Sequence, residues 1–304
     1  MRATLNLFSG RPNPTWRLSP SHARELVDRV TAGAPVAPDE PPRLGFRGVT
    51  LETEIDDVAR RAPVPARFVV QRAAVSDTRR EAPVRKSARR AAAARDADVR
   101  PAADTLRWLL TTGGGAVPDD VLEAADAAMR AESAPAPQPR ALGTSGPRQA
   151  EAPSLDGDAC DPFLTPIVAE FWDVPAVRLR NNCYNYAANF ASHTLAQPGR
   201  RAGRPYTGFV CDTVAAAARF DGCIPGCSGS VRVIAMAIWP GFDFHWWRLH
   251  PNGFWAHKIG TSPVLQVDNS GRVLGNGLTP ATCDRGPYTQ FCAFFYAPLG
   301  MEVL

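Results

Sequence analysis

A β-hairpin with a well-defined turn is the feature that most restricts how this chain can fold. Two runs rich in aromatic residues, Phe244 to His250 and Phe254 to Ile259, flank the tripeptide Pro251-Asn252-Gly253. Proline and asparagine favour a type I turn, and glycine accepts the left-handed position that follows it. The sequence therefore predicts a three-residue loop in which His250 faces Phe254 across the hairpin.

The hairpin register predicts which side chains share a face, because successive residues of a strand point to opposite sides. One face is expected to hold His245, Trp247, Leu249, Trp255, His257 and Ile259, and the other to hold Trp246, Arg248, His250 and Lys258. We expect the first face to point inward, with His245 and His257 as diagonal neighbours, and His250 to point to solvent. A two-residue loop would place Lys258 inward beside His245, and the cost of burying that charge argues against it.

A second informative stretch surrounds Cys183. Asn181 and Asn182, both good helix-capping residues, stand directly before it, and an apolar face continues at positions 183, 187, 190 and 194. We expect a helix that begins at Cys183, carries the thiol on its buried side and ends at Gln197-Pro198-Gly199. The positive end of such a helix stabilises a thiolate, and its free N–H groups can bind an oxyanion. A buried cysteine with a structural role is the alternative.

The distribution of aromatic residues divides the chain. All five Tyr, five of the seven Trp and eleven of the fourteen Phe lie after residue 160, so the larger core is expected in the C-terminal part. We predict an α+β protein with three parts. Residues 1–72 form a small strand-helix-strand unit with a turn at Ser9-Gly10-Arg11-Pro12-Asn13-Pro14, residues 73–157 form a disordered Ala/Pro/Arg linker with a helical hairpin at about 104–132, and residues 158–304 form the main domain.

Charge and composition limit the possible partners and locations. The basic run between residues 79 and 90 lacks the interleaved aromatic residues that would stack on bases, so a nucleic-acid partner is disfavoured. No apolar run approaches the roughly 20 residues of a membrane span. The first eight residues are too short and polar for a secretory signal, so we expect a cytoplasmic or non-classically exported protein. The sequence does not indicate an oligomeric state, and no cofactor is expected.

The cysteines other than Cys183 leave two possibilities open. They are Cys160, Cys211, Cys223, Cys227, Cys283 and Cys292. An even set is typical of an exported protein braced by disulfides, whereas a cytosolic protein would keep every thiol reduced. The sequence does not decide between them.

A helix-borne cysteine followed by strands that carry two inward histidines resembles the papain-like cysteine amidases, especially the CHAP and NlpC-type enzymes. The resemblance implies that a Cys-bearing helix packs on an antiparallel sheet, and that the protein is a hydrolase of the thiol-protease kind. Cys183 would be the nucleophile, His245 the base and His257 the group that orients it, with Asp268 as an alternative to His257. Asn182 or Asn181 would help to hold the oxyanion, and the substrate cleft would be lined by Asn181, Tyr184, Trp247 and Trp255.

Four motifs also resemble an uncharacterised bacterial family that supplies no activity. They are Ser-Gly-Arg-Pro-Asn-Pro at residues 9–14, Asn-Asn-Cys-Tyr-Asn-Tyr at 181–186, His-Trp-Trp-Arg at 245–248 and Trp-Ala-His-Lys at 255–258. The predicted function is cleavage of a peptide, peptidoglycan-like or acyl substrate. Two alternatives stay open: a zinc site made by Cys183, His245, His257 and Asp268, and a non-catalytic binding module that presents the Trp-rich hairpin.

Overall fold

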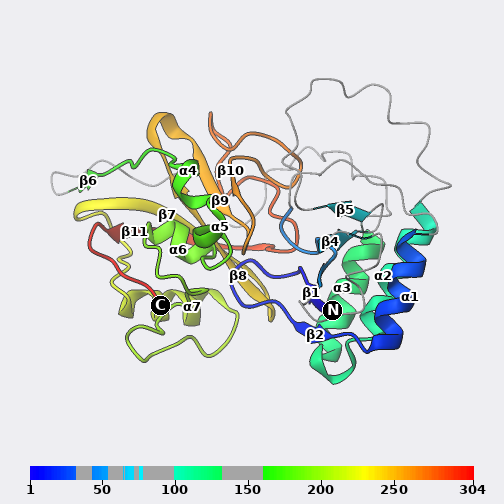
Figure 1. Ribbon diagram of the computed structural model, residues 1–304. Coiled ribbons are helices and arrows are strands. Elements are labelled where there is room, and N and C mark those ends of the chain that lie inside the picture. The colour runs from blue at the N-terminus through cyan, green and yellow to red at the C-terminus, as the bar shows by residue number, and fades with distance from the viewer. Residues whose placement is uncertain (32–42, 54–63, 65, 72–74, 78–98, 132–159) are drawn as a thin grey trace, which may run out of the picture. The chain divides into compact units, whose positions relative to one another are not determined.

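The computed structural model describes the chain except for residues 32–42, 54–63, 65, 72–74, 78–98 and 132–159 (Figure 1). The described residues form a mixed α+β protein with two β-sheets. The chain divides into two compact units. The first comprises Met1–Leu7, Asn13–Pro41 and Phe46–Gln138, and the second comprises Phe8–Pro12, Pro42–Gly45 and Pro139–Leu304. The predicted α+β class is confirmed at this level.

The first unit contains a five-stranded antiparallel sheet in the order β2-β1-β3-β4-β5. Its strands are β1 (Arg2–Leu5), β2 (Thr15–Arg17), β3 (Val49–Glu52), β4 (Arg67–Val70) and β5 (Val75–Asp77). Its helices are α1 (Pro20–Thr31), α2 (Val99–Thr111) and α3 (Asp119–Ala131), with a 3-10 turn at Gly114–Ala116. The backbone N–H of His22 donates to the Ser19 hydroxyl at 3.1 Å, as expected for a helix that begins after a serine cap.

Helices α2 and α3 occupy the segment for which the sequence predicts a helical hairpin. The rest of the predicted linker lies mostly outside the described residues, which resume at residues 75–77 and 99–131 and again at Cys160. The division of the chain at residues 72 and 157 stays a prediction. None of the described helices is long and apolar enough to cross a membrane.

The second unit is built on a six-stranded sheet. Five of its strands lie in the order β10-β9-β8-β7-β11, and β6 pairs in parallel with β7. The strands are β6 (Cys160–Pro162), β7 (Gly229–Trp239), β8 (Asp243–Leu249), β9 (Trp255–Lys258), β10 (Val264–Leu265) and β11 (Gln290–Pro298). The helices are α4 (Ala169–Trp172), α5 (Pro175–Arg178), α6 (Cys183–Ala188) and α7 (Cys211–Phe220), and α6 packs on β8 (Figure 1).

The β8–β9 hairpin has the predicted register. The backbone N–H of His250 donates to the carbonyl of Phe254 at 2.7 Å, and Trp247 pairs with His257. Gly253 takes the left-handed conformation with φ +76°. The three-residue loop is therefore confirmed, and it places His245 and His257 on one face.

The prediction that the opposite face of the hairpin meets solvent is wrong. His250 is only 1% exposed, and Arg248 and Lys258 are fully buried. The chain between β6 and α6 supplies carbonyl acceptors for two of these groups: Lys258 Nζ donates to Arg178 and Asn181 at 2.7 and 2.6 Å, and His250 Nδ1 donates to Thr165 at 2.6 Å. Arg248 donates to the carbonyl of Tyr186, within α6, at 2.7 Å. Lys258 Nζ also donates to the carbonyl of Gly260 at 2.5 Å, so three acceptors surround the ammonium group, while burial lowers the pKa of Lys258 to about 7.

Helix α6 is shorter than predicted. It ends at Ala188, because Asn189 adopts the left-handed conformation with φ 56° and its N–H donates back to the carbonyls of Asn185 and Tyr186. Asparagine is one of the few residues that accepts this helix-ending conformation. The expected continuation to residue 197 is therefore wrong, and the segment after Asn189 instead packs as a loop.

Four of the seven cysteines, all of which lie in the described residues, form disulfides. Cys160 is bonded to Cys227, and Cys211 is bonded to Cys292. The first bridge ties β6 to the loop before β7, and the second ties the start of α7 to β11. The remaining thiols, Cys183, Cys223 and Cys283, are free and buried. Thus neither of the two expected patterns, six paired cysteines or none, is observed.

Candidate functional site

The thiol of Cys183 is enclosed in the core of the second unit. Cys183 is the first residue of α6 and is fully buried, and its Sγ lies 3.9 Å from the carbonyl oxygen of Phe244. Burial raises the pKa of this thiol well above its usual range, and the nearby carboxylate of Asp243 raises it further. The helix N-terminus does not offset these effects, so the neutral thiol is the stable form.

The two asparagines before Cys183 have structural partners for their side chains. The Asn182 oxygen accepts from the N–H groups of Tyr184 and Asn185 as the cap of α6, and its amide donates to the carbonyls of Gly10 at 2.6 Å and Ala196 at 2.8 Å. The Asn181 amide donates to Val177 at 2.7 Å, and its oxygen accepts from His193. The Asn182 amide therefore uses both of its donors in the core, and the Asn181 amide uses one of its two.

The two inward histidines form a hydrogen-bonded chain. His245 Nε2 lies 2.8 Å from His257 Nδ1, and His257 Nε2 lies 2.9 Å from the carbonyl oxygen of Val267. A carbonyl oxygen can only accept, so His257 donates to Val267 from Nε2. When both imidazoles are neutral, His257 Nδ1 is then an acceptor, and His245 donates to it from Nε2. Burial lowers the pKa of His257 to about 4, while the hydrogen bond to Val267 and the charge of Asp268 raise it, so His257 is neutral at pH 7.

The partner at the other end of this chain is Ser9, which sequence reasoning missed. The Ser9 hydroxyl lies 2.9 Å from His245 Nδ1, which leaves that nitrogen as an acceptor. Ser9 also contacts Tyr288, whose hydroxyl is 2.9 Å away, and a hydrogen bond with Ser9 lowers the pKa of the Cys183 thiol. Thus His245 is paired with a serine of the N-terminal motif, and the same serine contacts Cys183.

A buried carboxylate, Asp243, organises the same motif. Its two oxygens accept the backbone N–H groups of Ser9, Gly10 and Arg11 at 2.6, 3.0 and 2.9 Å. The Tyr288 hydroxyl donates to it at 2.5 Å. Three successive N–H groups around an anion form a nest, which is why these residues lie inside the second unit rather than in a surface turn. Burial raises the pKa of Asp243, and these donors lower it.

Position 10 accepts only glycine, because the packing against Phe244 leaves no room for a side chain. A Cβ atom on it would lie 2.6 Å from the carbonyl oxygen of Phe244 and closer still to the Phe244 ring. The Ser-Gly-Arg-Pro-Asn-Pro motif was the only sequence signal for this contact. From the sequence, a simple turn is favoured there and a turn that holds an anion is the alternative. Nothing in the pattern of residues pointed to Asp243 as its partner.

The other predicted site residues lie apart from this chain or serve the core. Asp268 accepts from the backbone N–H groups of Ser270 and Arg272 and from the Arg272 guanidinium, so it stabilises its own turn. Tyr184 donates from its hydroxyl to Asp221 at 3.0 Å. Trp247 and Trp255 are 1% and 2% exposed, so they fill the core and do not line a cleft.

The residues of the predicted zinc site do not converge. The described part of the chain contains no group of three or more His, Cys, Asp or Glu side chains placed to hold a metal ion. Asp268 is occupied by Arg272, and His257 uses both ring nitrogens in hydrogen bonds to His245 and Val267. The arrangement can order the core and pass a proton between buried groups, and it has no accessible nucleophile.

Comparisons with known proteins found a curated relative of this chain. No protein-family model matches this chain, and no solved structure matches it. A curated relative, insoluble matrix shell protein 1 of Ruditapes philippinarum, is 42% identical over 126 residues, which cover 40% of this chain and 82% of the relative.

This relative overturns three predictions. The chain is similar to a shell matrix protein of Ruditapes philippinarum, so the resemblance to an uncharacterised bacterial family and to the CHAP and NlpC-type amidases was misleading. The predicted function as a cysteine hydrolase or thiol protease is also wrong, and the non-catalytic alternative fits better. Because the identity is 42% and most of the relative is covered, the chain belongs to the family of insoluble matrix shell protein 1.

Proposed function

We propose that this protein is a non-catalytic component of an insoluble matrix, where it acts as a binding module. The observation that carries the proposal is the burial of every group that resembled a catalytic residue. Ser9, Cys183, Asp243 and His245 are 0% exposed, and His257 is 1% exposed. A substrate would have to displace the core to reach them, whereas a structural role requires only the hydrogen bonds that they already make.

The position of α6 against the antiparallel sheet supports this view of the site as a scaffold. Its cap, its buried cysteine and the two histidines hold β8, β9 and the N-terminal motif together. We propose the papain-like arrangement, in which a helix packs on an antiparallel sheet, only as a scaffold that supports a binding surface. The tryptophans of the hairpin do not form that surface, because Trp246, Trp247 and Trp255 are buried.

The proposed partner is a polymer of the matrix. The relative is named for an insoluble matrix, and a binding module there would need stability in an exposed setting. The two disulfides fit this requirement, since they persist in oxidising surroundings. The proposed role is to bind this polymer and not to cleave it.

A sedimentation assay tests the proposal. The full chain is mixed with demineralised, insoluble shell matrix of Ruditapes philippinarum, and the pelleted fraction is measured. We expect saturable binding by the native chain, and equal binding by Cys183→Ala, because the thiol is not used. The chain denatured and alkylated serves as a control for non-specific adsorption.

Catalysis is tested with the same preparation. The native chain should release no product from peptide, amide or acyl-ester probes, and Cys183→Ala should behave identically. Turnover that disappears in Cys183→Ala, or native protein that stays in the supernatant as the denatured control does, would contradict the proposed function.

A further inference from the structure

Two arginines flank Tyr206 at the surface of the second unit, and the hydrogen bonds described above use neither guanidinium group. Arg11 belongs to the N-terminal motif, and Arg200 lies in the loop between α6 and α7. Arg200 is exposed, whereas Arg11 is only partly exposed.

Gln197 holds these two segments together. Its side-chain amide donates to the carbonyl of Gly10 at 2.9 Å, and its side-chain oxygen accepts from the Tyr206 hydroxyl at 2.8 Å. Its backbone carbonyl accepts from the N–H of Arg200 at 3.0 Å. The residue directly after Gly10 and the residue bonded to Gln197 therefore both start beside Tyr206.

Aromatic rings hold the guanidinium group of Arg11. Its Cζ lies 3.9 Å from the centroid of the Phe8 ring and 5.3 Å from that of Phe209, whose ring in turn lies 5.1 Å from Tyr206. Ring faces attract the cation but accept none of the N–H groups at the edge of its plane. The rings thus order the guanidinium group and leave its donors for another partner.

The charges of both arginines reach the Tyr206 hydroxyl. Burial and the charge of Asp243 raise the pKa of Tyr206 to about 12, against the opposing charges of Arg11 and Arg200. Two cations that act on one hydroxyl also repel each other. Tyr206 is neutral at pH 7 and donates its proton to Gln197, so it does not compensate them.

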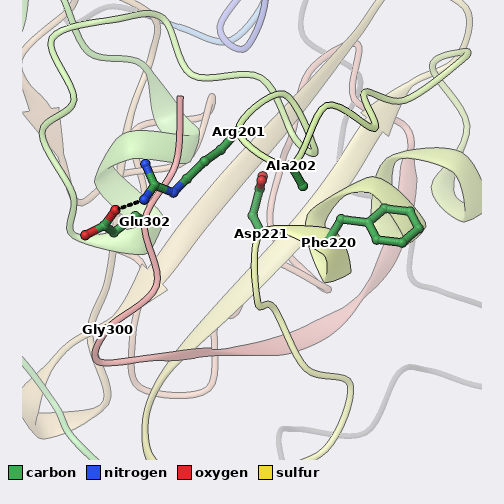
Figure 2. Close-up of a pocket in the computed structure, with 6 residues that line it drawn as sticks. All are labelled: Arg201, Ala202, Phe220, Asp221, Gly300 and Glu302. Carbon is green, nitrogen blue, oxygen red and sulfur yellow. Dashed lines mark ion pairs between the residues drawn. The ribbon is translucent and has the colours of Figure 1, made fainter.

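No carboxylate in the described part of the chain forms an ion pair with Arg11 or Arg200. Asp243, which acts on the same hydroxyl, is fully buried and already occupied. Its donors are the N–H groups of Ser9, Gly10 and Arg11 and the hydroxyl of Tyr288. The neighbouring Arg201 differs, because it is paired with Glu302 (Figure 2). An anion from outside the described residues would therefore find two uncompensated guanidinium groups at Tyr206.

The surroundings of Arg11 favour an anion carried on a flexible stem. The fork of N–H groups on a guanidinium matches the two oxygens of a carboxylate. Because Arg11 is partly buried beside Phe209, the carboxylate must reach past this ring. A glutamate side chain does so with two methylene groups, which find apolar contacts on Phe209 and on Val210, itself 47% exposed. A carboxylate attached directly to a sugar ring would bring the bulky ring against Phe209.

We infer that Arg11 and Arg200 together bind a side-chain carboxylate of an acidic polypeptide. Both guanidinium groups donate to the carboxylate oxygens, and the methylene stem packs against Phe209. The inference rests on the proposed function as a matrix-binding module, and it names the chemistry of the polymer that is bound.

Calorimetric titration of the full chain with end-capped hexaglutamate tests the inference. The titration is made at an ionic strength of about 0.15 M, where attraction between exposed charges is screened beyond about 8 Å. Hexaglutamine is the neutral peptide control, and hexagalacturonate carries the same number of carboxylates on sugar rings. We expect hexaglutamate to bind, hexaglutamine not to bind, and hexagalacturonate to bind at least fivefold more weakly than hexaglutamate.

Variants separate this pair of arginines from the general positive charge of the protein. Arg11→Gln and Arg200→Gln should each weaken the binding of hexaglutamate at least fivefold. Arg180→Gln removes the same charge from an exposed position after α5 of the same unit, and it should change the affinity less than twofold. Circular dichroism and thermal unfolding confirm that each variant is folded before titration.

Four results would overturn the inference. They are no binding of hexaglutamate by the native chain, equal binding of hexaglutamine, unchanged affinity in folded Arg200→Gln, and an equal loss in Arg180→Gln. Tighter binding of hexagalacturonate that is lost in Arg200→Gln would also overturn it, in favour of an acidic polysaccharide.

The sedimentation assay distinguishes this inference from the proposed function. If the native chain sediments with the matrix but does not bind hexaglutamate, the proposed function stands without this site. Binding of hexaglutamate by a chain that does not sediment would leave the carboxylate site and remove the matrix function.

Discussion

Mild acid should destabilise the second unit strongly, because two histidines are buried there in their neutral form. Burial lowers the pKa of His257 to about 4, as described above, and it does the same for His250, whose pKa the charge of Arg248 lowers further. In an unfolded chain a histidine titrates near pH 6.5. Between pH 6.5 and pH 4 the unfolded chain therefore binds more protons than the folded one, and stability falls as the pH falls through this window.

The size of the effect follows from the two pKa shifts. At pH 5 each histidine favours the unfolded chain by about 2 kcal/mol, since most unfolded imidazoles are protonated there and most buried ones are not. Together they lower the free energy of unfolding by about 4 kcal/mol between pH 7 and pH 5, and the loss grows until about pH 4. This is a large part of the roughly 5–15 kcal/mol that stabilises a typical domain.

Urea unfolding at a series of pH values, followed by tryptophan fluorescence, measures this loss. Trp172, Trp239, Trp246, Trp247 and Trp255 belong to the second unit, so the signal comes mainly from it. In His257→Gln one titrating group is removed, and the loss between pH 7 and pH 5 should fall to about half. A free energy of unfolding that stays constant from pH 7 to pH 5, or the same pH slope in His257→Gln, would refute the reasoning.

Three further predictions concern buried groups of the second unit. Gly10→Ala should lower the free energy of unfolding by about 3 kcal/mol through the clash with Phe244, whereas Gly208→Ala, with open space around its position, should leave the urea midpoint unchanged. Asp243→Asn should cost about 3 kcal/mol in the same assay, because its NH₂ group would face a backbone donor such as the N–H of Arg11; a loss below about 1 kcal/mol would contradict the charged nest. The three free thiols should react with a disulfide reagent only in urea, and reaction of any of them in native protein at pH 8 would show that the burial is incomplete.

The parts of the fold that sequence reasoning predicted depend on local geometry. The Pro251-Asn252-Gly253 turn determines the hairpin register within a few residues, and it correctly placed His245 beside His257. The cap of α6 was predicted for the same reason, because Asn182 bonds to groups only two and three residues away. The early end of α6 was not predicted, because the left-handed conformation at Asn189 depends on how the following loop packs.

The parts that could not be predicted depend on residues far apart in the chain. Ser9 and His245 are separated by 236 positions, and no periodicity links them. The burial of Lys258 could not be predicted for the same reason, because it also depends on residues far away in the chain. A charged residue on one face of a strand usually indicates solvent, and here it is compensated by carbonyl groups from a segment 80 residues earlier.

The insertion of residues 9–11 around Asp243 has a consequence for the order in which the protein is made. These residues emerge from the ribosome 232 positions before the carboxylate that they bind. At about 5–20 residues per second, roughly 10 to 50 s pass before the contact can form. Throughout this interval the start of the chain must remain available, and the core of the second unit cannot close until the last third of the chain has been synthesised. Contacts of such long range slow folding and prolong the exposure of apolar strands, so synthesis of this protein passes through a long period in which aggregation competes with assembly.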